Sequence, residues 1–159
     1  MKFNLLDKIE QLSETRIVAL KQVSLAEEYL ADHFPTFPVL PGVMMLEALT
    51  QAAGWLLHRR SGFEKSLAVL KEARNVKYGQ FVAPGNALRV EVELLKTTET
   101  GASFKAVGSV GDATAVSARL DLAYFNLAEK HPELAGIDAK LKEHNRGRWA
   151  ALSHGSVLV

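Results

Sequence analysis

Two short hydrophobic runs open the chain, with polar residues between them. Residues 4–12 and 16–23 are rich in Leu, Ile and Val, and residues 13–15 read Ser-Glu-Thr. Short apolar runs around a polar turn are typical of two β-strands. We therefore predict strands over 4–12 and 16–23, with a helix over 4–12 as the main alternative.

A proline-rich loop comes next and leads into a long helix. The loop contains the sequence HFPTFPVLPG, whose three-residue proline spacing favours extended backbone. Residues 42–60, GVMMLEALTQAAGWLLHRR, are rich in strong helix formers and begin just after Pro41. Because apolar residues occur all round this helix, we expect the rest of the protein to bury it on most sides.

The second half of the chain has the pattern of β-strands joined by turns. In residues 88–94, LRVEVEL, apolar residues alternate with charged ones, which predicts one face toward a core and one toward water. Gly, Pro, Asn and Asp lie between the strand-like segments, as turns require. The predicted strands cover residues 67–78, 88–95, 104–110 and 113–125.

One long helix beside about six strands indicates an α+β fold in which an antiparallel sheet curls around a central helix. We assign residues 1–125 to this domain. Residues 126–159 differ in composition and form a C-terminal extension, for which we predict an amphipathic helix over 135–144 and a loose terminus.

Composition and charge narrow the functional classes. The chain has 159 residues, 48% hydrophobic and 23% charged, which fits one globular domain with a core. A net charge of +1 gives no reason to expect nucleic acid or an anionic membrane as partner. Cysteine is absent, and charges interrupt the first ten residues, so we expect a cytoplasmic protein without disulfides. The long helix is too short and too polar for a membrane span.

Four residues interrupt the apolar helix at helical spacing. Glu47, Gln51, Gly54 and His58 are separated by four, three and four positions and therefore share one face. A carboxylate inside an apolar helix is costly unless it is paired or functional. Glu47 is thus a candidate acid or base, and the alternative is a glutamate that reaches solvent or a subunit partner.

Two further candidates lie at the loop before the helix. His33 precedes Glu47 by fourteen positions, so the loop can bring its imidazole toward the helix, although a lone loop histidine is more often structural. Gly42 begins the helix, where free N–H groups and the dipole stabilise a developing negative charge. The alternative for Gly42 is a residue chosen only for the tight turn.

Read together, HFPTFPVLPGVMMLEALTQ resembles the motif HFPGxPxxPGVLxxEAxAQ of FabZ-type 3-hydroxyacyl-acyl-carrier-protein dehydratases. His33, Gly42, Val43, Glu47 and Gln51 all fall in register. The likeness extends over about residues 4–125 and leaves the C-terminal extension outside. A glutamate at position 47 favours the plain dehydratase over the dehydratase-isomerase type, which carries aspartate.

The resemblance implies a hot-dog fold and a homodimer whose active site is shared between subunits, and it allows further assembly into a trimer of dimers. His33 would take a proton from C2 of the acyl chain, and Glu47 of the other subunit would assist departure of the C3 hydroxyl. Gly42, Val43 and Gln51 would bind the substrate, a thioester on acyl carrier protein or CoA. The reaction needs no metal and no organic cofactor. Apolar residues of the helix and the next strand would line a tunnel for the acyl chain.

The sequence also departs from the family pattern. Asp32 and Thr36 replace glycines beside the motif, and Val69 lies where many members carry a gating tyrosine. We therefore do not expect the usual chain-length gate. Basic residues that are candidate contacts for an acidic carrier protein, or simply solvated charges, are Arg59, Arg60, Lys71, Arg74 and Lys77.

Two other functions remain compatible with the sequence. A hot-dog acyl-CoA thioesterase would use a helix carboxylate such as Glu47 to activate water, but it has no need of an in-register His33. A non-catalytic acyl-binding module would keep the fold and lose the site residues, whereas both are present here.

Overall fold

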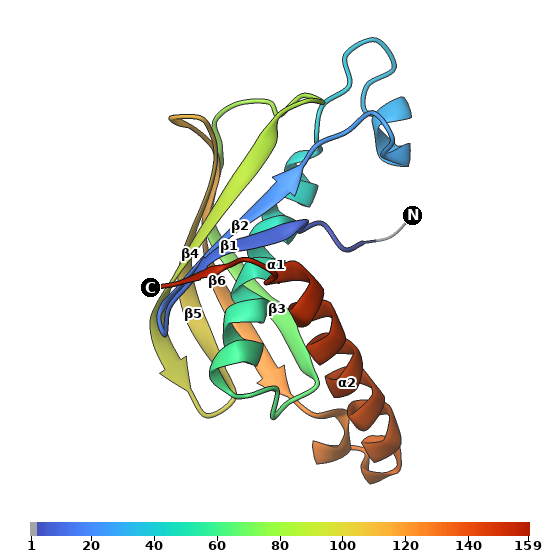
Figure 1. Ribbon diagram of the computed structural model, residues 1–159, viewed down its shortest axis with the longest axis vertical. Coiled ribbons are helices and arrows are strands. Elements are labelled where there is room, and N and C mark those ends of the chain that lie inside the picture. The colour runs from blue at the N-terminus through green and yellow to red at the C-terminus, as the bar shows by residue number, and fades with distance from the viewer. Residues whose placement is uncertain (1–2) are drawn as a thin grey trace.

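The computed structural model describes residues 3–159. Its framework is one curved sheet of seven strands in the order β3-β6-β5-β4-β2-β1-β7 (Figure 1). All neighbouring strands are antiparallel except β1 and β7. The strands are β1 (Lys8–Leu12), β2 (Arg16–Gln22), β3 (Leu67–Tyr78), β4 (Ala87–Thr98), β5 (Gly101–Val110), β6 (Ala113–Phe125) and β7 (Val157–Leu158).

The alternating segment at 88–94 lies in the middle of the sheet, in β4. Leu88, Val90 and Val92 are fully buried on its inner face, as the alternation predicts. Val90 pairs with Ala19 of β2 on one side and Gly108 of β5 on the other. The register therefore places one continuous apolar surface on the concave side of the sheet.

The helix α1 (Gly42–Arg60) fills that concave side. Ala48, Leu49, Ala52, Ala53 and Leu56 have no exposed surface, so the sheet buries the helix as its apolar composition predicts. Arg59 and Arg60 end the helix, and their positive charges suit the negative end of its dipole. A sheet wrapped around one central helix is the hot-dog arrangement, and the predicted fold class is confirmed.

The C-terminal extension is more ordered than its sequence indicates. The helix α2 (Ala135–Leu152) runs eight residues beyond the predicted end, and the predicted loose terminus is wrong. Val157 and Leu158 form β7 beside β1, and the amide of Val159 donates to the Leu12 carbonyl at 2.9 Å. A two-residue strand takes its stability from a partner far away in sequence, which local composition does not reveal.

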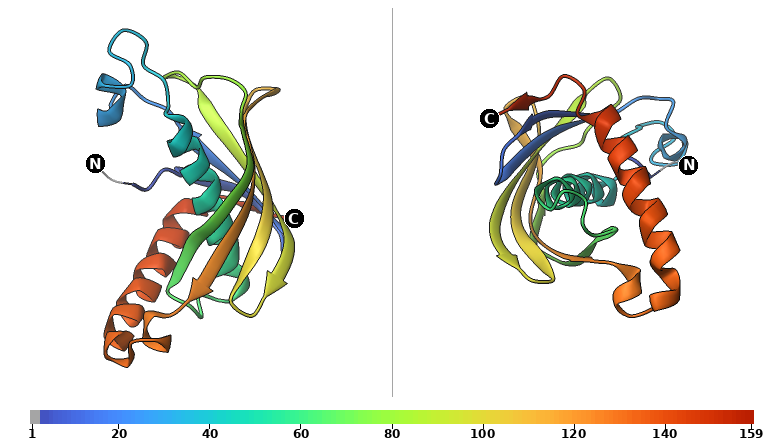
Figure 2. Two further views of the ribbon diagram at one scale, coloured as in Figure 1. Left: turned by 180° about the vertical axis from the view of Figure 1, so that it is seen from behind. Right: turned by 60° about the horizontal axis from the view of Figure 1, so that its bottom comes forward.

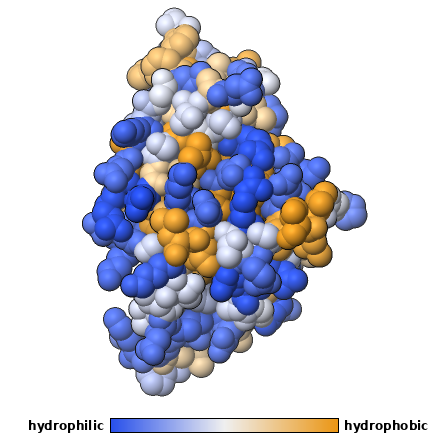
Figure 3. All heavy atoms as spheres, turned by 90° about the vertical axis from the view of Figure 1, so that its left-hand side faces the viewer, coloured by the Kyte–Doolittle hydropathy of each residue, from blue (hydrophilic) through white to orange (hydrophobic). Residues whose placement is uncertain are grey.

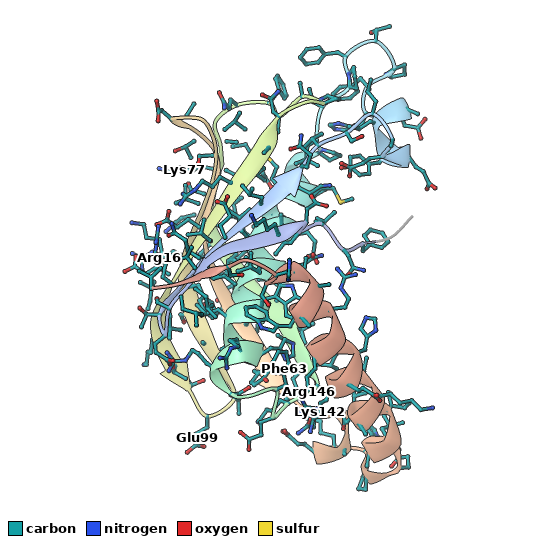
Figure 4. The ribbon with its side chains drawn as sticks, in the orientation of Figure 1. Arg16, Phe63, Lys77, Glu99, Lys142 and Arg146 are labelled. Atoms are coloured by element: carbon teal, nitrogen blue, oxygen red, sulfur yellow. The ribbon has the colours of Figure 1, made fainter. Side chains whose placement is uncertain are left out.

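The extension also closes the open side of α1. In the right-hand view of Figure 2, α1 lies between the sheet and α2. Trp149 of α2 packs against Trp55 of α1 with ring centroids 6.0 Å apart. Figure 4 shows Arg146 beside Phe63, and its guanidinium carbon lies 5.8 Å from the ring centroid. The helix α2 thus completes the burial of α1 that the sheet begins.

A buried carboxylate anchors the start of α2. Asp138 accepts hydrogen bonds from the amides of Leu127 and Ala128, both at 2.9 Å, and from the Ser66 hydroxyl. These hydrogen bonds hold the pKa of Asp138 below its usual value against the opposing effect of burial. They tie α2 to the 3₁₀ turn η2 (Leu127–Glu129) and to the segment before β3.

Two details of the first forty residues differ from the sequence prediction. The first strand covers Lys8–Leu12 only, although Leu5 and Leu6 before it are buried. A 3₁₀ turn η1 (Glu28–Ala31), absent from the prediction, precedes the proline loop. Further along the chain, the 3₁₀ turns η2 and η3 (Pro132–Leu134) before α2 are also absent from the prediction.

The outer face of the sheet is mostly hydrophilic, with small scattered hydrophobic areas (Figure 3). Arg16 and Lys77 project from this side, away from α2 (Figure 4).

Among the described residues, no helix is long and apolar enough to cross a membrane.

Candidate active site

The polar stripe of α1 lines one pocket. Glu47, Gln51, Gly54 and His58, which the helical spacing assigns to a common face, all border a cavity of about 210 Å³. The other residues that line the pocket are Asn4, Thr50, Trp55, Ala68 and Asn145. Asn4, Thr50 and Asn145 carry polar side chains, so the prediction that this stripe faces a polar environment is confirmed.

Glu47 is held in place by its neighbour one turn later. Gln51 Nε2 donates to Glu47 Oε1 at 2.9 Å and to the Phe3 carbonyl at 2.6 Å, while Gln51 Oε1 accepts from the Leu5 amide at 3.0 Å. All these contacts fix the orientation of the Gln51 amide. Its N–H group therefore points at the carboxylate, which keeps the half-buried Glu47 in one rotamer at the pocket wall.

His58 borders the same pocket, eleven residues after Glu47. Burial lowers the pKa of His58 to about 4, because desolvation penalises the charged ring more than a backbone contact with Lys65 favours it. Its Nδ1 lies 3.3 Å from the Tyr124 hydroxyl, which also contacts the Ser61 hydroxyl. The ring is therefore neutral near pH 7.

His33 lies in the loop before α1 and has a defined tautomer. Its Nδ1 is 2.9 Å from the Val39 carbonyl, and a carbonyl only accepts, so Nδ1 carries the proton. In the neutral ring this leaves Nε2 with a free lone pair. The Val39 amide donates back to the His33 carbonyl at 2.9 Å, which locks the loop around the imidazole.

Gly42 and Val43 present free amides at the start of α1. The Met44 and Met45 amides donate to the Pro41 carbonyl, whereas within residues 3–159 the amides of Gly42 and Val43 have no hydrogen-bond partner. A Cβ on Gly42 would lie 2.9 Å from the Tyr78 ring. Glycine thus allows the close approach of Tyr78, and the free amides are able to bind a negatively charged oxygen.

Some predicted site residues come together within one chain, and others do not. Glu47 and Gln51 are hydrogen-bonded, but across residues 3–159 neither a hydrogen bond nor an ion pair joins His33 to Glu47. The sequence analysis missed Asn4, Thr50, Trp55, Ala68 and Asn145 of the pocket. Asn145 belongs to α2, outside the family motif, and no sequence pattern connects it to Glu47.

The candidate carrier contacts are not gathered into one cluster. Arg59 and Arg60 end α1, whereas Lys71, Arg74 and Lys77 lie on β3. Arg74 is already paired with Asp121 at 2.6 Å. In the described part of the chain no group of three His, Cys, Asp or Glu side chains is placed to hold a metal ion.

These groups together support proton transfer next to a bound carbonyl. A neutral imidazole with a free Nε2 suits a general base, a carboxylate in a fixed rotamer suits the partner acid or base, and free helix amides stabilise a developing oxyanion. The fold and this set of groups define a hot-dog protein equipped for acid–base chemistry on a carbonyl substrate.

Known proteins with similar sequences agree with this class. Residues 1–119 match the family model described as a FabA-like domain, so the chain belongs to the FabA-like family. It is 35% identical over 118 residues to the 3-hydroxyacyl-[acyl-carrier-protein] dehydratase FabZ of Clostridium perfringens, a match covering 74% of this chain and 85% of the relative. The FabZ of Solibacter usitatus is 34% identical over 131 residues, or 82% and 81% of the two chains.

The fold recurs in solved structures of low sequence identity. The dehydratase heterocomplex ApeI:P from Xenorhabdus doucetiae contains a chain that superposes with a TM-score of 0.68 at 23% identity. The match covers 84% of this chain and 90% of the other. It shows a shared hot-dog architecture.

Proposed function

We propose that this protein is a dehydratase that converts 3-hydroxyacyl thioesters, carried on acyl carrier protein, to trans-2-enoyl thioesters. The observation that carries the proposal is the in-register pair of His33 and Glu47 in a chain of the FabA-like family. His33 has its Nε2 free, and Gln51 fixes Glu47.

The chain's own groups divide the reaction between them. His33 Nε2 takes a proton from C2, and Glu47 assists departure of the C3 hydroxyl, so that one proton and one hydroxyl leave as water. The negative charge that develops on the thioester carbonyl is stabilised by the free amides of Gly42 and Val43. Such electrostatic stabilisation is commonly worth about 100- to 1,000-fold in rate.

The active site is completed by a second copy of the chain. The strand β3 forms one edge of the sheet, and its outer side has no partner among the described residues (Figure 2, left). Val69 and Tyr78 on β3 are about half exposed, and Val43, which follows Gly42 near the Tyr78 ring, is 70% exposed. An unpaired edge next to exposed apolar residues suits a twofold dimer, in which His33 faces the partner's Glu47. Three such dimers can assemble further into a hexamer.

The carrier of the acyl group is acyl carrier protein in this proposal, with CoA as the alternative. Arg59, Arg60, Lys71 and Lys77 lie at the surface and are candidate contacts to an acidic carrier and to a phosphopantetheine phosphate. The thioesterase alternative has no support from the curated relatives, which are named as dehydratases.

Turnover of crotonyl thioesters on carrier protein and on CoA tests the proposal. Hydration lowers the absorbance of the conjugated enoyl thioester, and a thiol reagent detects hydrolysis. We expect hydration, faster on carrier protein, and loss of at least about 100-fold in both His33→Ala and Glu47→Gln. Release of free thiol would instead identify a thioesterase, and no turnover would identify a binding module.

A further inference from the structure

The helix α2 contributes a wall to the pocket that begins at Glu47. Asn145 borders this pocket, and its Nδ2 donates to the Ser66 carbonyl at 3.1 Å, which fixes the side chain. Trp149, one turn further along α2, packs on Trp55 of the pocket wall. The family model ends at residue 119, so this wall is a feature of the extension and not of the shared domain.

The far part of the pocket offers hydrogen-bonding atoms that the protein itself does not use. His58 Nδ1 faces the Tyr124 hydroxyl, and among residues 3–159 no hydrogen bond engages His58 Nε2 or Asn145 Oδ1. The Tyr124 hydroxyl donates to the Lys65 carbonyl at 3.3 Å and can accept from His58 Nδ1, which leaves Nε2 of the neutral ring as an acceptor. Both free atoms are therefore acceptors that lack a donor.

Two polar groups between Glu47 and His58 are already satisfied. Thr50 donates to the Leu46 carbonyl at 3.0 Å, and the Gln51 amide has partners for both its nitrogen and its oxygen. Besides Asn4 and the second oxygen of Glu47, the unused acceptors of the pocket are those of His58 and Asn145. A ligand that enters from Glu47 passes Thr50 and Gln51 before it reaches these two acceptors.

The size of the pocket fits the tail of an acyl chain. Its 210 Å³ equals the volume of about seven water molecules at ~30 Å³ each. With C3 of the substrate at Glu47, this leaves space for roughly seven further chain atoms, or about ten carbons in total. The end of such a chain lies among His58, Asn145 and Trp55.

We propose that α2 makes this acyl pocket selective for chains whose far end carries a hydroxyl or another hydrogen-bond donor, recognised by Asn145 and His58. The proposal rests on the dehydratase function, since it places C3 of the substrate at Glu47. An acyl chain without such a donor would displace water from the two acceptors and would leave them without a hydrogen-bond partner.

Intrinsic fluorescence offers a direct binding measurement. Of the two tryptophans of the chain, Trp55 lines this pocket and Trp149 packs against Trp55. The probes are octanoyl and decanoyl thioesters of N-acetylcysteamine, each with and without a hydroxyl on the terminal carbon. These saturated thioesters lack the C3 hydroxyl and do not react, so the titration measures binding alone.

We expect at least one hydroxylated probe to bind about five- to tenfold more tightly than its unsubstituted counterpart, the effect of one hydrogen bond in a buried site. Asn145→Leu should abolish or reverse this preference. Glu143→Leu, on the exposed side of the same helix, should retain it. Equal affinities of the wild type for both members of each pair would overturn the proposal whether or not Asn145→Leu folds.

The outcome is separable from that of the proposed function. Wild type that hydrates crotonyl thioesters but shows no preference for hydroxylated probes would reject the selectivity alone. Wild type that shows the preference but neither hydrates nor dehydrates would reject the dehydratase, and with it the placement of C3 at Glu47. A preference unchanged in Asn145→Leu would remove α2 from the recognition.

Discussion

Gln51 Nε2 lies 2.9 Å from Glu47 Oε1, one helical turn away on the same face of α1. The same amide also binds the backbone at Phe3 and Leu5. Gln51 therefore connects the candidate catalytic carboxylate to the N-terminal segment. We regard it as a positioning residue, since it acts on the substrate through Glu47.

Gln51→Ala tests this positioning role. Without the amide, Glu47 becomes free to adopt other rotamers, and we expect kcat to fall about tenfold or more while KM changes little. Loss of the hydrogen bonds to the N-terminal segment should also lower the free energy of unfolding by about 1–3 kcal/mol. Steady-state kinetics and urea denaturation measure the two effects.

A matched glutamine provides the control for that variant. Gln22 is exposed at the end of β2, donates to the Asn86 carbonyl at 3.1 Å and makes no hydrogen bond to Glu47. Gln22→Ala should leave kcat unchanged. If Gln51→Ala kept wild-type kcat, the hydrogen bond to Glu47 would have no role in catalysis.

The lowered pKa of His58 predicts that the free energy of unfolding depends on pH. Its pKa is about 4 in the folded protein and about 6.5 when unfolded, so between these values the unfolded state binds more protons. The contribution of His58 to stability is complete above pH 6.5 and is lost as the pH falls toward 4. From pH 7 to pH 5 the free energy of unfolding should therefore fall by about 2 kcal/mol.

Urea denaturation at pH 7 and pH 5 measures this change, and His58→Gln should remove most of it. His131, whose side chain is 62% exposed, supplies the control His131→Gln, which should keep the wild-type pH dependence. The same pH dependence in wild type and His58→Gln would show that His58 titrates normally in the folded protein.

The variant Gly42→Ala tests why α1 begins with a glycine. The new methyl group would lie 2.9 Å from Tyr78 Cε1, and it would also obstruct a thioester carbonyl at the free amides. We expect kcat/KM to fall about 10- to 100-fold, with the free energy of unfolding changed by no more than about 1 kcal/mol.

The double variant Gly42→Ala with Tyr78→Ala separates the two explanations. If obstruction of the carbonyl is the cause, removing the Tyr78 ring does not restore activity. Recovery of wild-type kcat/KM in the double variant would show that the glycine serves only to accommodate Tyr78.

Much of the shared domain could be predicted because its signals are local. The helix α1 begins at Gly42 and ends at Arg60, as the proline before it and the helix formers within it predict. β3 and β6 also match their predicted ranges, since turn residues bracket them. The name of the fold and the roles of the site residues, by contrast, came from the resemblance of the His33–Gln51 motif to a family.

The C-terminal extension could not be predicted because its signals are long-range. Val157 pairs with Gln11, and Asn145 reaches a pocket that starts at Glu47, contacts that no local periodicity encodes. An aspartate in a helix with many charged residues, such as Asp138, is expected to be exposed. Its side chain is instead buried and accepts hydrogen bonds from three donors.

Subunit complementation tests most directly the claim that His33 and Glu47 act together across a dimer. His33→Ala and Glu47→Gln, each inactive alone, are mixed in equal amounts, unfolded and refolded together, and assayed for hydration of crotonyl carrier protein. Random pairing gives half heterodimers with one intact site each, so we predict recovery of about one quarter of wild-type activity. Refolded mixtures that stay as inactive as the separate variants would contradict the shared site.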